Sequence, residues 1–584
     1  MMEAARATWA RPQRRAIWDS LDGASGSVPA VALLIWAASL ADVNPEKMGS
    51  TGLVSVLPVW TLLAFAAVNV SFVAAVARAR LDTRTLAAHL GALIVMLYAT
   101  TALVEPQPAF EAAYRHVGIA DYIGSAGTVD TRIDAYFNWP GFFTLVAFFT
   151  HAAGLHNGLS LVPWAPLFYN VLYLGPLVVI FRSLTSDRRV VWLAVWLFYL
   201  TNWTAQDYFS PQGTSYFLYL VAIAVLLRWF TPPADPVSPA QRVGLLAVAI
   251  AACAAVVPMH QLTPFALLAS VTALVLWAGC TVRLLPVLLA VLIAAWMSYM
   301  TVGFLNGNLA HLLGTIGNLG GTVTTNVSNR IGGDAGHRLV VDARLLLTAA
   351  LWVLAAAGWR LLPRRGRRPV TVLALAPLPL LVLQAYGGEM LIRVALFSLP
   401  FAAFLAASAV SAALTSGARW RVAIAATASV AMIVALLFAR FGNEQMDAFS
   451  SGDVAGVRAL YRIAPPGSQL IAVSGPVPWR TQDYNSYRYE RLTTRLPTIK
   501  DAPIVARPPL PLQLRDLMRA SAPRRSFLIV TRSQIDGDAL LGTVTTPART
   551  VAAQLRASHI FDVAYANRDA TIFTLNAVGE AGGS

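Results

Sequence analysis

The chain has 584 residues, of which 57% are apolar and 12% are charged, and its mean hydropathy is +0.59. A soluble globular chain has about 45–50% apolar and about 25% charged residues, so this composition excludes a soluble enzyme, a disordered protein and a fibrous protein. It is typical of a polytopic α-helical membrane protein. The net charge of +15 lies mostly in short connections between apolar segments, which indicates membrane orientation rather than nucleic-acid binding.

A helix needs about 20 mostly apolar residues to cross about 30 Å of hydrocarbon. By this criterion we expect about 13 transmembrane helices within a membrane domain at 28–440. The predicted spans are 28–43, 52–76, 86–104, 163–182, 190–205, 213–230, 243–262, 265–282, 284–305, 341–359, 370–387, 391–414 and 422–440. Residues 1–27 are polar and basic and lack a small-residue cleavage site, so they are expected to form a cytoplasmic N-terminal segment.

Arginines mark one side of the predicted membrane domain. The N-terminal segment and alternate connections hold 20 arginines, and the densest group lies at 360–368. Basic residues favour the cytoplasm, so the N-terminus is expected inside and, after 13 spans, the C-terminus outside. Residues 137–155 are apolar but include Pro140 and Gly141, and a crossing there would put the 360–368 arginines outside. We therefore expect an aromatic helix in the outer membrane interface.

The tail, 441–584, is predicted to be a separate extracytoplasmic α/β domain. Its apolar runs shorten to strand length at 469–473, 527–531 and 571–575. Helical patterns at 453–462 and 547–557 alternate with these strands, which favours an α/β arrangement. Residues 476–525 are rich in Pro, Arg and Tyr and are expected to be irregular.

The first long outer loop, 105–162, is expected to carry interfacial helices, and it collects acidic residues beside them. Its candidate ionisable residues are Glu105, Glu111, His116, Asp121, Asp130 and Asp134. A carboxylate held at the lipid surface could act as a general base on a lipid-linked substrate. Any outer loop is also solvated and acidic, so the role of each single member stays open. Trp139, in the aromatic segment that follows, is a further candidate for binding substrate.

Polar residues at the outer ends of later spans form a second set of candidates. Asp207 and Gln212 flank Tyr208 and Phe209, in a combination that suits a sugar site, although Asp207 could equally cap a helix. His260 lies in a similar turn. Glu389 and Arg393 are four residues apart, so they share one helix face at the end of a span.

Charges at membrane depth tend to face the protein interior or a wet cavity. Arginine suits bidentate recognition of phosphate, and a polyprenyl phosphate carrier presents its phosphate at that depth. The Glu389–Arg393 pair is therefore a candidate donor site, although a structural ion pair explains the same spacing. The chain contains no nucleotide-binding motif such as GxxxxGK[ST] or GxGxxG, which favours a lipid-linked donor that carries its own leaving group.

The segments HVGIADYI, DAYFNWPGFF, DYFSPQ, HQLTPF and YGGEMLIRV resemble actinobacterial members of the GT-C superfamily of integral-membrane glycosyltransferases. The acidic first outer loop and the outer α/β tail are similar to that superfamily as well. The resemblance implies transfer of a hexosyl or pentosyl group from a polyprenyl-phosphate donor to a cell-envelope glycan or lipid acceptor. The reaction is expected on the outer face of a bacterial plasma membrane.

The resemblance also implies that an acidic residue of the first outer loop is the catalytic base, and Asp134 is preferred over Asp121 and Asp130 because it precedes the interfacial helix. Some members use a divalent metal and others do not, which leaves the cofactor open. Three alternatives remain: an O-antigen-polymerase-like or ligase-like enzyme of lipid-linked glycans, a lipid-linked glycan transporter, and a catalytically silent scaffold whose tail binds glycans. The absence of an internal repeat in the sequence counts against transport.

Overall fold

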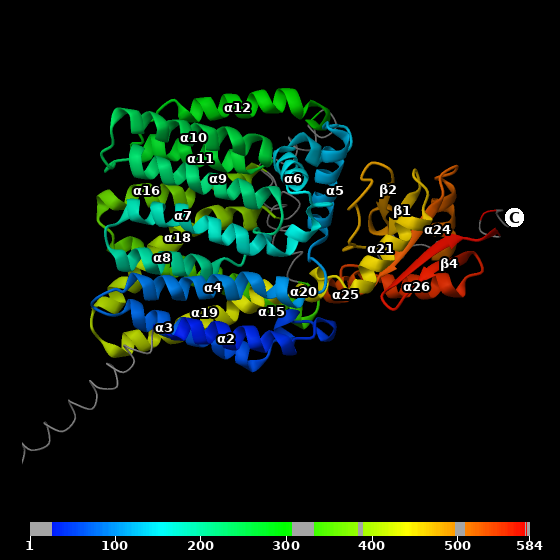
Figure 1. Ribbon diagram of the computed structural model, residues 1–584, viewed down its shortest axis with the longest axis horizontal. Helices are drawn as coiled ribbons and strands as arrows, with labels where there is room; N and C mark the ends of the chain where they lie inside the picture. Colours follow the sequence, from blue (N-terminus) through cyan, green and yellow to red (C-terminus); the bar gives the residue numbers. More distant parts are fainter. Residues whose placement is uncertain (1–25, 306–331, 384–388, 497–508, 578–579, 581–584) are drawn as a thin grey trace, which may run out of the picture.

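The computed structural model describes residues 26–305, 332–383, 389–496, 509–577 and 580. A bundle of long helices is joined at one end to a smaller domain built on a β-sheet (Figure 1). We call the end of the bundle that faces this domain the sheet-domain end, and the opposite end the arginine end. Most of the predicted N-terminal segment, and most of the connection between the predicted spans 284–305 and 341–359, lie outside the described residues.

A helix overlaps each of the 13 predicted spans. The described residues contain eight helical stretches that are long and apolar enough to cross a membrane. Their helices are α3 (Val59–Val76), α4 (Thr83–Val104), α7 (Ala165–Leu184), α9 (Pro211–Val225), α10 (Pro239–Met259), α15 (Ala335–Leu361), α18 (Met390–Thr415) and α19 (Arg419–Phe441). The shorter helices at the other predicted spans are α2 (Val28–Ser39), α8 (Arg188–Thr201), α11 (Thr263–Trp277), α12 (Leu285–Met300) and α16 (Arg364–Leu375). The chain is thus a membrane-embedded, polytopic α-helical protein.

Two predicted spans have wrong boundaries, and proline explains both. The span predicted at 52–76 begins as a helix only at Val59, because Pro58 follows a short 3₁₀ turn and stays extended. The span predicted at 370–387 is not one helix. Helix α16 ends at Leu375, before Pro377 and Pro379, and α17 (Leu380–Leu383) follows as a single turn. Proline has no N–H for the helical hydrogen bond, so closely spaced prolines interrupt the ladder.

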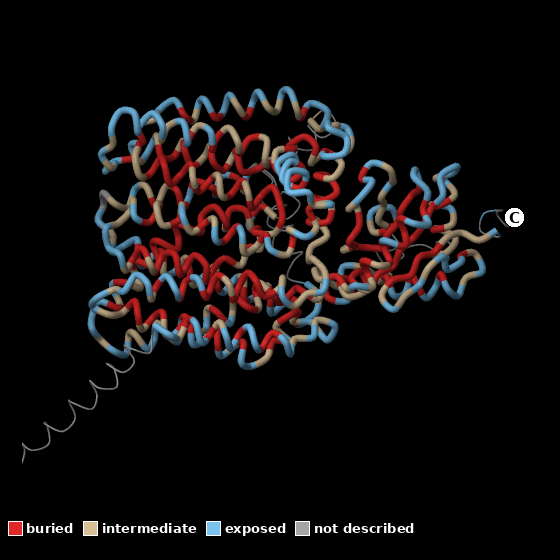
Figure 2. Tube along the Cα trace, in the orientation of Figure 1, coloured by how far each residue is buried: buried red, intermediate tan, exposed pale blue. Residues whose placement is uncertain are grey.

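Helix α18 is the core of the bundle, with most of its residues buried against α8 and α15 (Figure 2). Helix α12 is the opposite case, because only three of its 16 residues are buried. The other faces of α12 present leucine and valine outward, as expected for a helix that contacts lipid.

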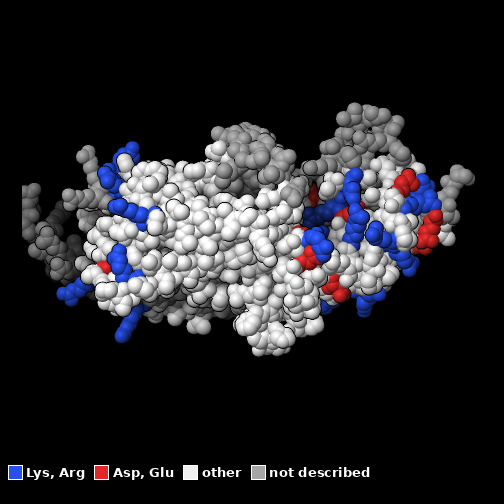
Figure 3. Space-filling view, turned by 90° about the horizontal axis from the view of Figure 1, so that it is seen from above, with Lys and Arg blue, Asp and Glu red and all other residues white. Residues whose placement is uncertain are grey.

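The arginine-rich connections meet at the arginine end, and their side chains bind one another's backbones. Arg189 donates to the carbonyl oxygen of Arg78 at 2.6 Å, and Arg228 donates to that of Arg182 at 3.2 Å. Figure 3 shows Lys and Arg at this end, a broad uncharged band over the bundle, and mixed charges on the sheet domain. This distribution is typical of a membrane-embedded bundle.

The chain between α4 and α7 stays at the sheet-domain end. It forms α5 (Glu111–Ala126), the 3₁₀ turn η4 (Ala135–Asn138) and α6 (Gly141–Ala152). Helix α6 has 12 residues, about 18 Å, which is too short to cross about 30 Å of hydrocarbon. It packs against α5, α9 and α10, in agreement with the expectation of a helix that does not span the membrane.

The tail folds into a five-stranded mixed sheet in the order β2-β1-β3-β5-β4, covered by helices on its faces. Strands β1, β3 and β5 coincide with the three predicted strands, whereas β2 and β4 were not predicted. The strands are β1 (Gln469–Ala472), β2 (Arg488–Arg491), β3 (Ser526–Thr531), β4 (Phe561–Ala566) and β5 (Ala570–Leu575). The helices are α21 (Ser451–Ile463), α24 (Leu510–Arg519), α25 (Arg532–Leu541) and α26 (Ala548–Ala557), of which α21 and α26 match predicted helices.

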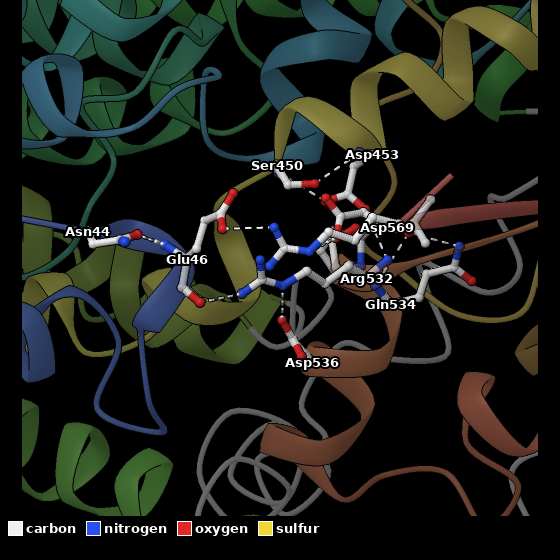
Figure 4. Close-up of polar contacts among 12 residues, drawn as sticks. Asn44, Glu46, Ser450, Asp453, Arg532, Gln534, Asp536 and Asp569 are labelled. Atoms are coloured by element: carbon white, nitrogen blue, oxygen red, sulfur yellow. Dashed lines mark hydrogen bonds and ion pairs between the residues drawn. The ribbon is translucent and has the colours of Figure 1, made fainter. Parts of the chain in front are cut away.

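The sheet domain is docked on the bundle through polar contacts near the turn η2 (Pro45–Lys47). Arg532 donates to the carbonyl oxygen of Glu46 at 3.0 Å, and Arg568 pairs with the Glu46 carboxylate at 3.0 Å. Asp453 and Asp536 fix Arg532 from the other side, at 2.9 Å to its backbone nitrogen and 3.3 Å to its guanidinium (Figure 4). A second contact region, on α5, lies next to the candidate site.

Candidate functional site

A cavity of about 420 Å³ lies at the sheet-domain end, between the ends of the bundle helices and the α5–η4 segment. Four parts of the chain that are remote in sequence contribute to it: α5 with η4, the turn before α9, the end of α10, and the start of α18. Its lining residues are Ala112, His116, Tyr136, Trp139, Tyr208, Ser210, Pro211, Gln212, Met259, His260, Gln261, Glu389 and Arg393. Six predicted substrate-binding residues are therefore brought together: His116, Trp139, Gln212, His260, Glu389 and Arg393.

The start of α9 places Gln212 at the cavity. Ser210 caps the helix by accepting from the backbone nitrogen of Gly213 at 3.3 Å, and Pro211 occupies the first helical position, where no N–H is needed. The Gln212 amide nitrogen donates to the Thr263 hydroxyl at 3.4 Å, which leaves its carbonyl oxygen to face α18. The cap thus fixes a hydrogen-bond acceptor opposite Arg393.

Arg393 is held rigidly by neighbours that point it into the cavity. Its guanidinium donates to the side-chain amide oxygens of Gln212, at 3.1 Å, and of Gln206. It also donates to the Glu389 carboxylate at 2.7 Å. The Arg393 side chain is 6% exposed, whereas that of Glu389 is 42% exposed. The site therefore combines a fixed, preorganised cation with a carboxylate that stays open to ligand.

Two buried imidazoles at the cavity have opposite hydrogen-bonding roles. His116 Nδ1 lies 2.9 Å from the Phe209 carbonyl oxygen, so Nδ1 carries the proton and Nε2 is an acceptor. His260 Nδ1 accepts from the backbone nitrogens of Leu262 and Thr263, each at 3.2 Å, so its Nε2 is the donor. Burial lowers the pKa of both rings, that of His116 to about 4, so both are neutral at pH 7.

Asp134, the predicted base, is the N-cap of η4 and is engaged by three donors. Its Oδ1 accepts from the Tyr136 nitrogen at 2.7 Å, and its Oδ2 accepts from the Tyr484 hydroxyl at 2.6 Å and from Arg115. Burial acts to raise the pKa of Asp134, but Arg115 and these hydrogen bonds outweigh it and hold the pKa below its ordinary value. Asp134 lies behind the cavity wall that Tyr136 forms, and is itself outside the cavity lining.

Of the other predicted acidic residues, Glu389 lines the cavity, whereas Asp121, Asp130 and Asp207 are outside its lining. Asp130 pairs with Arg132 on the surface, at 2.9 Å. Asp121 lies further along α5, where partial burial raises its pKa. Asp207 pairs with Arg440 at 3.2 Å in a closed interior space, although the neighbouring Tyr208 lines the cavity.

Several residues of the site were not predicted from the sequence. Gln206 immediately precedes Asp207, so the polar character of that turn could have indicated it. Tyr136 lies within the motif DAYFNWPGFF and Arg115 immediately precedes HVGIADYI, but neither is an acidic residue of the kind expected to act as the base. Tyr484 carried no signal, because nothing in the sequence relates a tyrosine of the tail to the first loop.

A divalent metal, which the family resemblance leaves open, is not assigned to the described residues. No three His, Cys, Asp or Glu side chains are grouped among them in a way that could hold a metal ion. Asp130 and Asp134 are each occupied by an arginine. No step of the chemistry below is assigned to a metal.

The sequence matches no protein-family profile and no curated protein. The structure is similar to the crystal structure of the Archaeoglobus fulgidus oligosaccharyltransferase tethered to an acceptor peptide, with a TM-score of 0.51 and 13% identity over 79% of this chain and 71% of that one. The chain has the GT-C fold. It is also similar, with a TM-score of 0.49 and 13% identity over 85% of this chain and 99% of that one, to ArnT from Cupriavidus metallidurans bound to undecaprenyl phosphate. The resemblance that the sequence motifs indicated is confirmed at the level of the fold.

Proposed function

We propose that this protein is a membrane glycosyltransferase that moves a sugar from a polyprenyl-phosphate donor to a cell-envelope glycan or lipid acceptor at the 420 Å³ cavity. The observation that carries the proposal is Arg393, a guanidinium fixed in a cavity at the end of a membrane bundle. The GT-C fold, shared with an oligosaccharyltransferase, supports the same reaction class. Aromatic rings and amides in the lining suit a sugar, whose ring stacks and whose hydroxyls need partners.

Arg393 is the proposed partner of the donor phosphate. When the sugar–phosphate bond breaks, the departing polyprenyl phosphate gains negative charge, and a preorganised cation stabilises that transition state. The charged residues in the described lining are Arg393 and Glu389, and the two histidines are neutral. Because the one positive charge in the described part of the lining is nearly balanced by the one negative charge, the cavity suits a monophosphate better than the more highly charged pyrophosphate.

A carboxylate is the proposed general base. As an acceptor hydroxyl attacks the anomeric carbon, its proton passes to the carboxylate, a role that contributes roughly 10²–10⁴-fold to the rate. Asp134 remains the proposed base, because its lowered pKa keeps it ionised at neutral pH and it accepts a hydrogen bond from the backbone nitrogen of Tyr136, which lines the cavity. Glu389 is the second candidate, because it lines the cavity and is more exposed.

Replacement of each carboxylate by its amide separates the two candidates. Asp134→Asn is expected to abolish transfer while leaving the protein folded, since the amide is nearly isosteric but cannot accept the proton. The same change at Asp121 or Asp130 should have less effect. Release of free polyprenyl phosphate from purified protein is the measurement, and full activity of Asp134→Asn with loss in Glu389→Gln would assign the base to Glu389.

The proposed location is the plasma membrane of a bacterium, with the cavity and the sheet domain on the outer side. The arginines at the opposite end of the bundle support this orientation. A cysteine introduced into the tail should react with an impermeant reagent in intact cells. Protection of the tail, with labelling of a cysteine in the 360–368 connection instead, would reverse the orientation.

The alternatives differ in what happens to the donor. A panel of hexosyl and pentosyl polyprenyl phosphates, followed for release of free lipid phosphate, tests the proposal and resolves the sugar class. A transporter would leave every donor intact. A polymerase-like or ligase-like enzyme would need a longer lipid-linked glycan and would release no phosphate from single-sugar donors.

A further inference from the structure

One loop of the sheet domain reaches across to the α5–η4 segment of the bundle. This docking loop, residues 473–487, connects β1 to β2. Its Tyr484 hydroxyl accepts from Arg115 Nε at 2.9 Å and donates to Asp134 Oδ2 at 2.6 Å. Tyr484 is buried, and its ring packs on that of Phe137 with 5.7 Å between the centroids.

Two further contacts fix the docking loop on α5. The Trp479 indole nitrogen donates to the Glu111 carboxylate at 3.0 Å, and Arg491 of β2 pairs with the same carboxylate. Further along α5, a Cβ atom on Gly118 would stand 1.8 Å from the carbonyl oxygen of Arg480. Helix and loop therefore meet backbone to backbone, at a spacing that only glycine allows.

We propose that Tyr484 is a positioning residue through which the sheet domain completes the active site. Tyr484 bonds both Asp134 and Arg115. These two residues in turn contact Tyr136, which forms part of the cavity wall. The links are direct: Asp134 accepts from the Tyr136 backbone nitrogen at 2.7 Å, and the Arg115 guanidinium carbon lies 4.7 Å from the centre of the Tyr136 ring. The inference rests on the proposed function, in which Asp134 is the base.

The hydroxyl of Tyr484 also acts on the ionisation of Asp134. The titratable groups that interact with the Asp134 charge include Arg115 and His116 of α5, Tyr136 of η4 and Tyr484 of the docking loop. A donor to a carboxylate stabilises its charged form, so removing the hydroxyl raises the pKa of Asp134. The acid limb of the pH–rate profile, with the rate expressed per folded molecule at each pH, should then move to higher pH.

The test compares Tyr484→Phe with Tyr487→Phe in the full-length protein, assayed for release of polyprenyl phosphate. Tyr487 lies in the same loop, but its hydroxyl donates to the Ala464 carbonyl oxygen, away from the site. We expect Tyr484→Phe to lower kcat about tenfold or more, with little change in the KM for donor, and to move the acid limb upward. Tyr487→Phe should leave both unchanged.

A second pair of variants tests the docking loop while the Tyr484 hydroxyl is kept. A Cβ atom on Gly118 would crowd the Arg480 carbonyl and would also stand 3.2 Å from the Tyr484 ring. Gly118→Ala forces the Arg480 carbonyl away from α5, whereas Gly124→Ala on the same helix meets nothing closer than the Ala147 side chain at 3.6 Å. Gly118→Ala should reproduce the Tyr484→Phe phenotype, and combining the two should add little further loss. Gly124→Ala should behave as the parent protein.

The outcomes separate this inference from the function on which it rests. If the parent protein releases phosphate from no donor of the panel, the proposed function is wrong and the inference falls with it. If the parent is active and Tyr484→Phe keeps its kcat and its acid limb, the function stands and the positioning role is wrong. A lower melting temperature for Tyr484→Phe with unchanged kinetics per folded molecule also overturns the role.

Discussion

Two arginine–carboxylate pairs lie at the same end of the helical bundle, and they differ in what surrounds them. Asp207 and Arg440 are 3.2 Å apart, with side chains 3% and 9% exposed. Glu389 and Arg393 are 2.7 Å apart, with side chains 42% and 6% exposed. In sequence both carboxylates stand at the end of an apolar segment and both were candidate site residues.

The first pair is closed on every side. Asp207 also accepts from the Asn170 amide, and the Arg440 guanidinium carbon lies 4.4 Å from the centre of the Tyr98 ring. The space beside the pair is about 40 Å³, against about 420 Å³ beside Glu389. Internal partners therefore engage the Asp207 carboxylate, whereas the Glu389 carboxylate is exposed to the cavity. A candidate site differs from a structural ion pair because it keeps polar groups exposed to a cavity after its internal hydrogen bonds are made.

The largest expected effect is on folding, at the closed pair. Asp207→Asn leaves the Arg440 charge buried without its counter-ion, and breaking one side of a buried pair costs about 3–5 kcal/mol. We expect low yield and a strongly reduced melting temperature in detergent, with normal turnover in whatever fraction folds. Asp130→Asn is the matched control, because the Asp130–Arg132 pair lies on the surface. A stable but inactive Asp207→Asn protein would remove the distinction between the pairs.

The open pair should behave in the reverse way. Removing both charges with Glu389→Gln and Arg393→Gln leaves no uncompensated ion, so the double variant should fold and melt close to the parent. It should lose turnover by about 10²–10³-fold, as for loss of a group that stabilises transition-state charge. Arg393→Lys should also be impaired, since lysine keeps the charge but loses the planar fork that binds Gln212 and Glu389 together.

Binding of a polyprenyl monophosphate to the same variants sharpens that result. Weaker binding in Arg393→Gln alone would place the phosphate at the guanidinium. A double variant that turns over at the parent rate would return Glu389 and Arg393 to a structural role, like that of Asp207 and Arg440.

The sequence predicted contacts of the candidate site correctly where they depend on short spacing within one helix. The four-residue spacing of Glu389 and Arg393 predicts one helix face, and the structure joins them. The sequence did not predict contacts between residues that tertiary packing brings together from distant parts of the chain. Arg440 follows Asp207 by 233 residues, and Tyr484 follows Asp134 by 350, so neither partner could be identified from spacing. The prediction of Asp134 as the base therefore did not include the three donors that engage it.

The two strands that were not predicted share a physical cause. In the order β2-β1-β3-β5-β4 they are the outer strands, and each has one unpaired edge. Strand β2 reads RYER and none of its residues is buried, while β4 has a single buried residue, Phe561. Edge strands are held by one neighbour and need no apolar run, whereas the central strands β1 and β3 are buried throughout.

The smallest predicted effect concerns His116, which combines features of both pairs. Like Asp207 it is buried, yet its Nε2 has no hydrogen-bond partner among the described residues. Burial, reinforced by Arg115, lowers its pKa to about 4 from an ordinary value of 6.5. Between those values the unfolded chain binds a proton that the folded chain does not, so stability is complete above pH 6.5 and falls, by up to about 3 kcal/mol, as the pH drops toward 4.

His116→Asn isolates this effect, because the asparagine amide nitrogen can replace Nδ1 as donor to the Phe209 carbonyl oxygen but cannot titrate. Melting temperatures measured from pH 7.5 down to pH 4.5 should fall less steeply for this variant than for the parent. Parallel curves would mean that the imidazole is not held neutral by the fold. A flatter curve together with a raised KM for the acceptor would instead assign the Nε2 lone pair to an acceptor hydroxyl, which places His116 with the open pair rather than the closed one.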